Sequence, residues 1–143
     1  MNLFTIGFSK KSAEEFFSLL TMHKIVRLID IRLNNKSQLA GFTNVKHLPY
    51  FLKLHNIEYS YCPELAPSKE LLTGFKNKSI SWQEYAAQYS EKLEANHVLK
   101  KIEWKNFKNA VLLCSEATPE MCHRRLLAEY LAQNNSDIKV IHL

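Results

Sequence analysis

The chain contains the run Ala110-Val-Leu-Leu-Cys114-Ser-Glu-Ala-Thr-Pro-Glu-Met-Cys122-His123-Arg124. Its first five residues are aliphatic enough to form a buried strand, and Thr118-Pro119-Glu120 is a strong signal for a helix start. The run therefore predicts a strand that leads into a helix from Pro119 to about Gln133. Turns between a strand and a helix are where α/β proteins carry their sites.

Other parts of the chain repeat this alternation. Apolar segments at about 2–6, 25–31, 57–61 and 138–142 predict four more strands. A capping box at Ser12-Ala-Glu-Glu15 predicts a helix to about His23, and a second helix at about 44–55 contains Pro49, which kinks it or marks its true start. Because strands that alternate with helices pair in parallel, we expect a three-layer α/β sandwich with a mostly parallel sheet of about five strands.

The segment from about 68 to 107 departs from this alternation. It is helical and amphipathic in pattern, with a second capping box at Ser81-Trp-Gln-Glu84 and a break at Asn96 that divides it. We interpret this segment as a helical insertion before the fourth strand. A length of 143 residues suits a single α/β domain over residues 1–143.

Composition limits the function classes. Nineteen Lys and Arg residues against 14 Asp and Glu residues give a net charge of +5, which favours anionic partners. No apolar segment reaches the roughly 18 to 20 residues of a membrane span, so we expect no membrane partner. Three cysteines at no zinc-finger spacing argue against a disulfide framework, and we expect a cytoplasmic protein with reduced thiols.

Polar side chains follow each of the first four predicted strands. Since parallel strands end at one edge of a sheet, where ligands bind, these residues predict one site. Its candidate catalytic residues are Asp30, Glu64, Cys114 and His123, and its candidate ligand-binding residues are Ser9, Arg32, Glu116 and Arg124. The sequence identifies no cofactor and no oligomeric state.

The last block of the site carries the most specific chemistry. Arg124 near a helix start could hold a phosphate or carboxylate, or could bridge to an acidic residue. Cys114 could be a nucleophile if the helix N-terminus or Arg124 favours its thiolate, or a small buried hydrophobic residue. His123 could move protons or could be a hydrogen-bonded core residue. Arg124 follows Cys114 by ten residues with no glycine between them, unlike the Cys-x5-Arg loop of phosphatases.

Two further sets of residues leave alternatives open. Asp30 and Arg32 share a face of an extended backbone, so they could pair with each other or with a ligand, and Asp30 could be a base or a loop-fixing carboxylate. Glu64 follows Pro63, which presents its carboxylate rigidly. Cys114, Cys122 and His123 could alternatively bind a metal, although the helical phase places Cys122 toward solvent, so that such a site needs a distorted first turn.

Several of these blocks together resemble a known family, the bacterial domain-of-unknown-function family 488, over nearly the whole chain. The blocks are Thr5-Ile6-Gly7-Phe8-Ser9, Asp30-Ile31-Arg32, Gly41-Phe42, Pro63-Glu64-Leu65, and Leu113-Cys114-Ser115-Glu116 through Cys122-His123-Arg124. The resemblance implies an α/β fold and a shared pocket. The chain differs from the family pattern at Phe8, where histidine is common, and at Cys62, where an aliphatic residue or histidine is more frequent.

The leading hypothesis for function is an enzyme or sensor that binds a small anionic, nucleotide-like ligand at the carboxyl ends of the strands. One alternative is a nucleic-acid-binding accessory protein that uses a basic surface, including the lysine-rich region 69–108. Another alternative is a Cys-His-Arg turn that binds a metal or only stabilises a loop.

Overall fold

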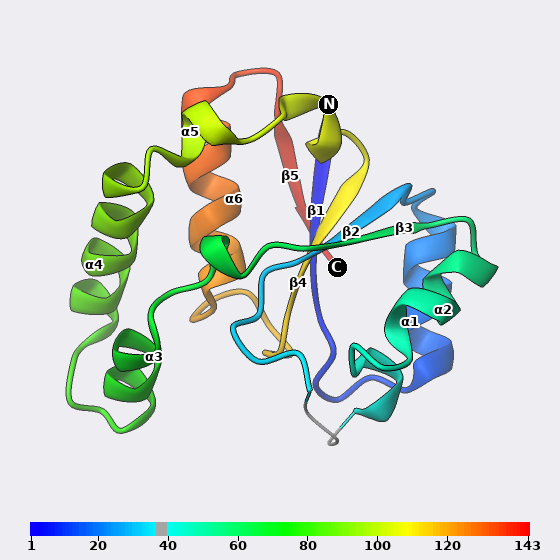
Figure 1. Ribbon diagram of the computed structural model, residues 1–143, viewed down its shortest axis with the longest axis horizontal. Helices are drawn as coiled ribbons and strands as arrows, with labels where there is room; N and C mark the ends of the chain where they lie inside the picture. Colours follow the sequence, from blue (N-terminus) through cyan, green and yellow to red (C-terminus); the bar gives the residue numbers. More distant parts are fainter. Residues whose placement is uncertain (37–39) are drawn as a thin grey trace.

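The computed structural model describes residues 1–36 and 40–143. Its centre is a five-stranded sheet in the order β3-β2-β4-β1-β5, in which all neighbouring strands are parallel (Figure 1). The strands are β1 (Asn2–Gly7), β2 (Arg27–Asp30), β3 (Glu58–Tyr61), β4 (Ala110–Cys114) and β5 (Lys139–His142). The predicted α/β fold with a parallel sheet is confirmed.

Helices cover both faces of the sheet, which gives three layers (Figure 1). One face carries α1 (Ala13–Met22) and α2 (Leu48–Leu54), preceded by the short 3-10 helix η1 (Gly41–Thr43). The other carries α3 (Lys69–Lys76), α4 (Trp82–Ala95), α5 (Val98–Lys101) and α6 (His123–Asn134), together with η2 (Pro63–Leu65) and η3 (Trp104–Phe107).

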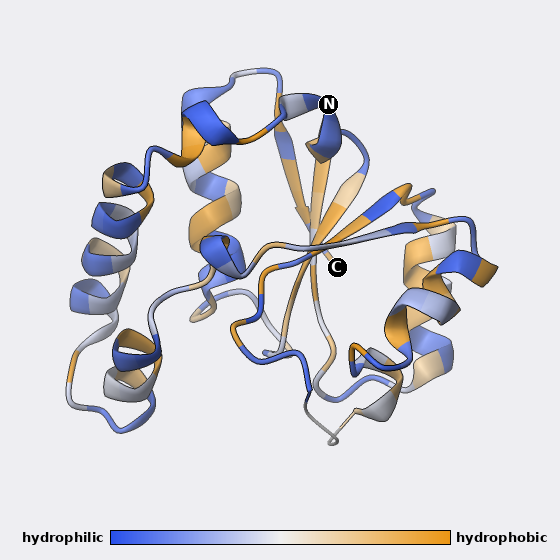
Figure 2. Cartoon of the chain, viewed as in Figure 1, coloured by the Kyte–Doolittle hydropathy of each residue, from blue (hydrophilic) through white to orange (hydrophobic). Residues whose placement is uncertain are grey.

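The side chains of β4 show why both faces are covered. Ala110 and Leu112 pack into the core beneath α6, whereas Val111 and Leu113 pack into the core beneath α1 and α2. All four are fully buried. Successive side chains of a strand point to opposite faces, so a strand that is apolar throughout must be covered twice. Figure 2 shows β1 and β4 largely in apolar colours between the two helical layers.

Local signals explain the starts of two helices. Ser12 and Glu15 form the predicted capping box at the start of α1. Helix α2 begins at Leu48, with Pro49 in its first turn. A proline is tolerated there because the first N–H groups of a helix have no intrahelical acceptor. Of the two interpretations of Pro49, the helix start is therefore the one observed.

The segment between β3 and β4 is helical, as predicted. Asn96 ends α4, and His97 adopts a left-handed conformation with φ 51° before α5 begins. Tyr85, Tyr89 and Leu93 form the buried stripe of α4 at a spacing of four residues. This stripe packs into the same core as α6 and brings α4 close to the end of β4.

The predicted start of the last helix is wrong. Helix α6 begins at His123, whereas Pro119 belongs to a separate turn in which Cys122 N–H donates to the Pro119 carbonyl oxygen at 3.2 Å. Cys122 is extended, with φ −128° and ψ 140°, and is 3% exposed. The expectation that Cys122 faces solvent is also wrong. It was based on the orientation that Cys122 would have in a helix beginning at Pro119, and Cys122 is not part of the helix.

Over residues 1–36 and 40–143, no helix has both the length and the apolar character that a membrane span requires.

Candidate functional site

The topology of the sheet has a switch point at the carboxyl end of β4. Strand β4 lies between β1 and β2. The chain leaves β1 and β2 toward the face that carries α1 and α2, but it leaves β4 toward α6 on the opposite face (Figure 1). At switch points of this kind α/β proteins commonly bind ligands. Cys114 is the last residue of β4 and lies at this switch point.

A cluster of two thiols and one imidazole surrounds the end of β4. The sulfur atoms of Cys114 and Cys122 are 2.7 Å apart, and Cys114 Sγ lies 3.6 Å from His123 Nδ1. All three side chains are buried. Their potential ligand atoms lie within 4.8 Å of one another. We refer to Cys114, Cys122 and His123 as the thiol-imidazole cluster.

The imidazole of His123 is held in one orientation. Its Nε2 lies 2.8 Å from the carbonyl oxygen of Ile31, which can only accept a hydrogen bond, so Nε2 carries a proton. Nδ1 consequently faces Cys114. The ring of Tyr89 on α4 packs edge-on against the imidazole, with 5.9 Å between the ring centroids. The inserted helix thus forms one wall of the cluster.

The contacts within the cluster change the acidity of its groups. Burial alone would raise the pKa of the Cys114 thiol, but the hydrogen bond from Cys122 and the positive charge of His123 lower this pKa well below its ordinary value. The hydrogen bond to Cys114, together with burial, raises the pKa of Cys122. Burial opposes protonation of His123, yet the charge of Cys114 raises the pKa of His123 above its ordinary value. These shifts favour a Cys114 thiolate beside a His123 imidazolium.

Arg124 lies next to the cluster and is fully buried. Its Nη1 donates to the Glu116 carbonyl oxygen at 2.8 Å, but Nε and Nη2 have no hydrogen-bond partner within residues 1–36 and 40–143. Only glycine fits at position 7, because a Cβ there would lie 1.5 Å from the Glu116 oxygen and 2.3 Å from Nη1. A buried cation with two unsatisfied donor atoms is costly, and an anion would satisfy both.

The charge of Arg124 acts on two nearby titratable groups. Burial and the charge of Arg124 lower the pKa of Lys11 and the pKa of His142. Among the ion pairs of the described residues, none involves Arg124. The guanidinium is therefore not neutralised by a carboxylate in direct contact, and the local field favours an anion.

Asp30 and Arg32 pair with each other at the end of β2. Asp30 Oδ1 accepts from Arg32 Nε at 2.8 Å and Oδ2 accepts from Nη2 at 2.9 Å. Tyr59 donates a further hydrogen bond to Asp30, and Arg32 donates to the Thr43 carbonyl oxygen at 2.7 Å. This network fixes the loop after β2 against η1. The proposed catalytic role of Asp30 and ligand-binding role of Arg32 remain predictions.

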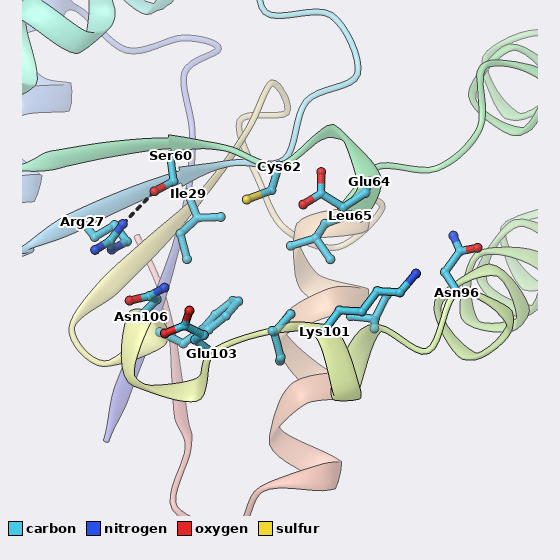
Figure 3. A pocket seen from close by; sticks show the side chains of 13 residues that line it. Arg27, Ile29, Ser60, Cys62, Glu64, Leu65, Asn96, Lys101, Glu103 and Asn106 are labelled. Carbon is cyan, nitrogen blue, oxygen red and sulfur yellow. Dashed lines mark hydrogen bonds between the residues drawn. The ribbon is translucent and has the colours of Figure 1, made fainter.

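Glu64 lies in a different cavity. Figure 3 shows its carboxylate beside Cys62, in a cavity of about 480 Å³ between β3 and the α5-η3 segment. The residues that line this cavity include Ile29 and Lys101 but no member of the thiol-imidazole cluster. Burial and the carboxylate of Glu64 raise the pKa of Cys62 to about 11. The sequence grouped Glu64 with Cys114, and the fold does not bring it to the cluster.

Ser9 and Glu116 border the cluster through their backbones. Ser9 N–H donates to the Ser115 carbonyl oxygen at 3.0 Å, which joins the loop after β1 to the loop after β4. Glu116 contributes its carbonyl oxygen to Arg124, and its side chain is exposed. Their predicted roles in binding a ligand stay predictions.

Sequence reasoning missed Tyr89, Lys11 and the Ile31 carbonyl as neighbours of the site. The spacing of Tyr85 and Tyr89 indicates a buried helical stripe, but no local signal says which part of the sheet the stripe covers. The contact made by a backbone carbonyl group cannot be inferred from the pattern of side chains.

The thiol-imidazole cluster also has the composition of a site for a soft metal ion. Two thiolates and one imidazole suit Zn²⁺ and leave a fourth position open. The bond from His123 Nε2 to the Ile31 carbonyl resembles the contact that orients metal-bound histidines. No distorted helical turn is required, because Cys122 lies just before α6.

Comparisons with known proteins identify the family. The chain matches the family described as domain of unknown function DUF488 over residues 12–131, a span that includes the thiol-imidazole cluster and Arg124. Neither a curated protein nor a solved structure matches the chain. The predicted resemblance is confirmed, and the chain belongs to the DUF488 family.

Proposed function

We propose that this protein is an enzyme in which Cys114 attacks a small anionic substrate held by Arg124. The observation that carries the proposal is the buried Arg124 guanidinium, whose Nε and Nη2 lack partners among the described residues, directly beside the thiol-imidazole cluster. A buried polar group without a partner points to a ligand that supplies one. The switch point of the sheet at the end of β4 supports the same location.

Each residue of the site then has a distinct role. Cys114 is the nucleophile, and the neighbouring His123 Nδ1 holds the proton that the thiol has lost. Arg124 binds the negative charge of the substrate. The Asp30-Arg32 pair is a positioning element, because it fixes the loop whose Ile31 carbonyl orients His123.

The substrate has to enter past loop 115–121. Cys114 is 3% exposed and Arg124 is fully buried, so neither is reached directly from solvent. The loop is held by hydrogen bonds from Ser9 N–H to Ser115, from Arg124 to Glu116 and from Arg125 to Glu120. These bonds have to break for the loop to open, and we expect an anion to replace the one from Arg124.

Ligand-induced changes in Tm test the proposal. Wild-type protein is heated with inorganic phosphate or with a panel of mononucleotides, and we expect at least one to raise Tm by mass action. Arg124→Met should abolish that rise. Arg125→Met is the control for the loss of one arginine from α6, since Arg125 pairs with Glu129 and, like Arg124, donates to a carbonyl oxygen of loop 115–121, but does so at the surface. A panel that leaves the wild-type Tm unchanged, or an equal rise in Arg124→Met, contradicts the proposal.

Metal binding is the second candidate function, and the convergence of three ligand atoms within 4.8 Å favours it. Elemental analysis of purified protein distinguishes the two candidates. Stoichiometric zinc that disappears in Cys122→Ser would assign the cluster to metal binding. Metal-free wild-type protein that retains the anion response supports the anion site at Arg124 over metal binding.

A further inference from the structure

A nucleophilic role for Cys114 leaves the second buried thiol without a function. Cys122 lies immediately before α6, is 3% exposed, and donates a hydrogen bond to Cys114. The two sulfur atoms are 2.7 Å apart, and a disulfide bond is about 2.05 Å long, so the two thiols are within reach of forming one. The closeness of the sulfurs points to a covalent step between them.

The third cysteine does not take part in this contact. Cys62 lines the separate cavity beside Glu64, and the residues that line this cavity include neither Cys114 nor Cys122. The fold therefore brings Cys114 and Cys122 together and keeps Cys62 apart from them. Cys62 also provides an internal control in the same molecule.

From this pairing we infer that Cys122 is a resolving cysteine, and that the reaction at this site is thiol-disulfide exchange with a low-molecular-weight disulfide that carries a carboxylate. The inference rests on the proposed function and names its substrate class. It requires no cofactor, because the substrate disulfide is itself the oxidant.

The electrons and protons balance over two exchanges. In the first, the Cys114 thiolate attacks one sulfur of the substrate, the substrate S–S bond breaks, and the departing thiolate takes the proton of His123 Nδ1. In the second, His123 removes the Cys122 proton, and the Cys122 sulfur attacks Cys114 in the mixed disulfide. The second substrate thiolate leaves and takes that proton. The protein loses two electrons and two protons, and one disulfide becomes two thiols.

The charge of the site selects among disulfides. Arg124 Nε and Nη2 can donate to the two oxygens of one carboxylate, and Lys11 and His142 lie within its field. A neutral disulfide leaves these donors unsatisfied. We therefore expect an anionic disulfide to react about tenfold faster than a neutral one, the difference that one hydrogen bond to a charged group provides.

Intact-mass spectrometry with glutathione disulfide as the probe tests the inference. Reduced wild-type protein, kept free of air, should become lighter by two hydrogen atoms and carry no adduct at the end. Cys122→Ser should stop at a mixed disulfide with one glutathione on Cys114. Cys62→Ser is the matched control and should behave as the wild type does. Cys122→Ala serves as a second variant, and circular dichroism confirms that each variant is folded.

The same experiment measures selectivity. Glutathione disulfide should react faster than neutral hydroxyethyl disulfide with the wild type and with Arg125→Met, and Arg124→Met should remove the preference. A stable glutathione adduct on wild-type Cys114 would overturn the role of Cys122 but leave the nucleophile intact. A wild type that never reacts, yet is stabilised by an anion through Arg124, would overturn disulfide exchange without removing the anion site.

Discussion

Arg124 combines complete burial with two donor atoms that have no partner among the described residues. Interactions within the folded chain do not explain such a residue, since burying an incompletely paired cation opposes folding. Gly7 leaves room for the guanidinium at the end of β1. These two observations are the basis on which we propose that Arg124 binds a ligand.

This assignment predicts the stability of Arg124→Met without ligand. Methionine fills a similar volume and removes an unsatisfied buried charge, while only the bond to the Glu116 carbonyl is lost. We expect the free energy of unfolding to stay within about 1 kcal/mol of wild type or to rise. Urea denaturation measures it. A loss of about 3 kcal/mol or more would show that Arg124 is a structural residue with partners in the fold.

The acidity of Cys114 gives a second prediction. Because the hydrogen bond from Cys122 and the charge of His123 outweigh burial, the pKa of Cys114 lies well below that of an ordinary thiol. Its thiolate should persist as the pH falls below the pKa of a free cysteine. His123→Gln should raise this pKa, and the ultraviolet absorbance of the thiolate during a pH titration reports both values. An unchanged titration in His123→Gln, with Cys114→Ser as the blank, would count against the ion pair.

The pKa of Cys62 is shifted in the opposite direction to that of Cys114, which gives a further prediction. Burial and Glu64 raise the pKa of Cys62 to about 11, so near neutral pH it is almost entirely protonated and should be alkylated slowly. Glu64→Gln removes the charge and should speed alkylation by lowering the pKa. Glu103→Gln is the control, because Glu103 lines the same cavity but pairs with Lys105. Equal rates in wild type and Glu64→Gln would exclude the carboxylate as a cause.

The end of β1 and the loop after β4 lie in close contact. A Cβ at position 7 would collide with the backbone oxygen of Glu116, and a backbone atom cannot rotate away as a side chain does. A Cβ added at Gly41, at the start of η1, would have no neighbour within 4 Å among residues 1–36 and 40–143. The two glycines therefore form a matched pair.

We predict that Gly7→Ala destabilises the protein by more than about 3 kcal/mol or prevents folding, since the overlap forces the two loops apart. Gly41→Ala should change the free energy of unfolding by less than about 1 kcal/mol. Thermal and urea denaturation of both variants measure the difference. Similar stabilities for the two variants would contradict the observed approach of the loops.

Elements with a local signal were predictable from the sequence. The capping box at Ser12 and the aliphatic run of β4 act within a few residues, so their pattern determines them. The start of α6 was not predictable in this way. Thr118-Pro119 is a good local start, but burial of Cys122 against Cys114 interrupts the helix until His123. A contact between residues eight apart thus outweighed a favourable local sequence.

The site, too, was predictable where local sequence determines it and not where tertiary packing does. Cys114, His123 and Arg124 converge because β4 leads directly into α6, and that follows from the strand-to-helix turn in the sequence. The segment between β3 and β4 places Glu64 in a separate cavity and Tyr89 against His123, and both placements depend on how this segment packs on the sheet. Packing of this kind is tertiary, and side-chain periodicity does not specify it.

For the whole molecule, strand order determines where chemistry can occur. Strand β4 lies in the middle of the sheet, and its neighbours β1 and β2 send their chains to the opposite face. The end of β4 is therefore the switch point of the sheet, and Cys114 lies there. The family match over residues 12–131 includes β2, β3, β4 and most of α6.

The net charge of +5 also concerns the whole molecule. Nucleic-acid binding through the lysines of region 69–108 stays a prediction, and a titration at several salt concentrations tests it. Phosphate contacts would make affinity fall steeply with salt. The present account expects weak binding with a shallow dependence. A steep dependence that charge-reversal in region 69–108 removes would favour the nucleic-acid alternative.

Competitive alkylation tests most directly whether a nucleophilic thiol lies beside an anion-binding guanidinium. Reduced protein is treated with anionic iodoacetate or with neutral iodoacetamide, and peptide mass spectrometry gives the rate at each cysteine. Cys62 lies beside the Glu64 carboxylate, which repels iodoacetate, so Cys114 in Arg124→Met supplies the reference ratio of the two reagents. We predict a higher ratio of iodoacetate to iodoacetamide at wild-type Cys114 than at Cys114 of Arg124→Met. Equal ratios at Cys114 in the wild type and in Arg124→Met would contradict the proposed site.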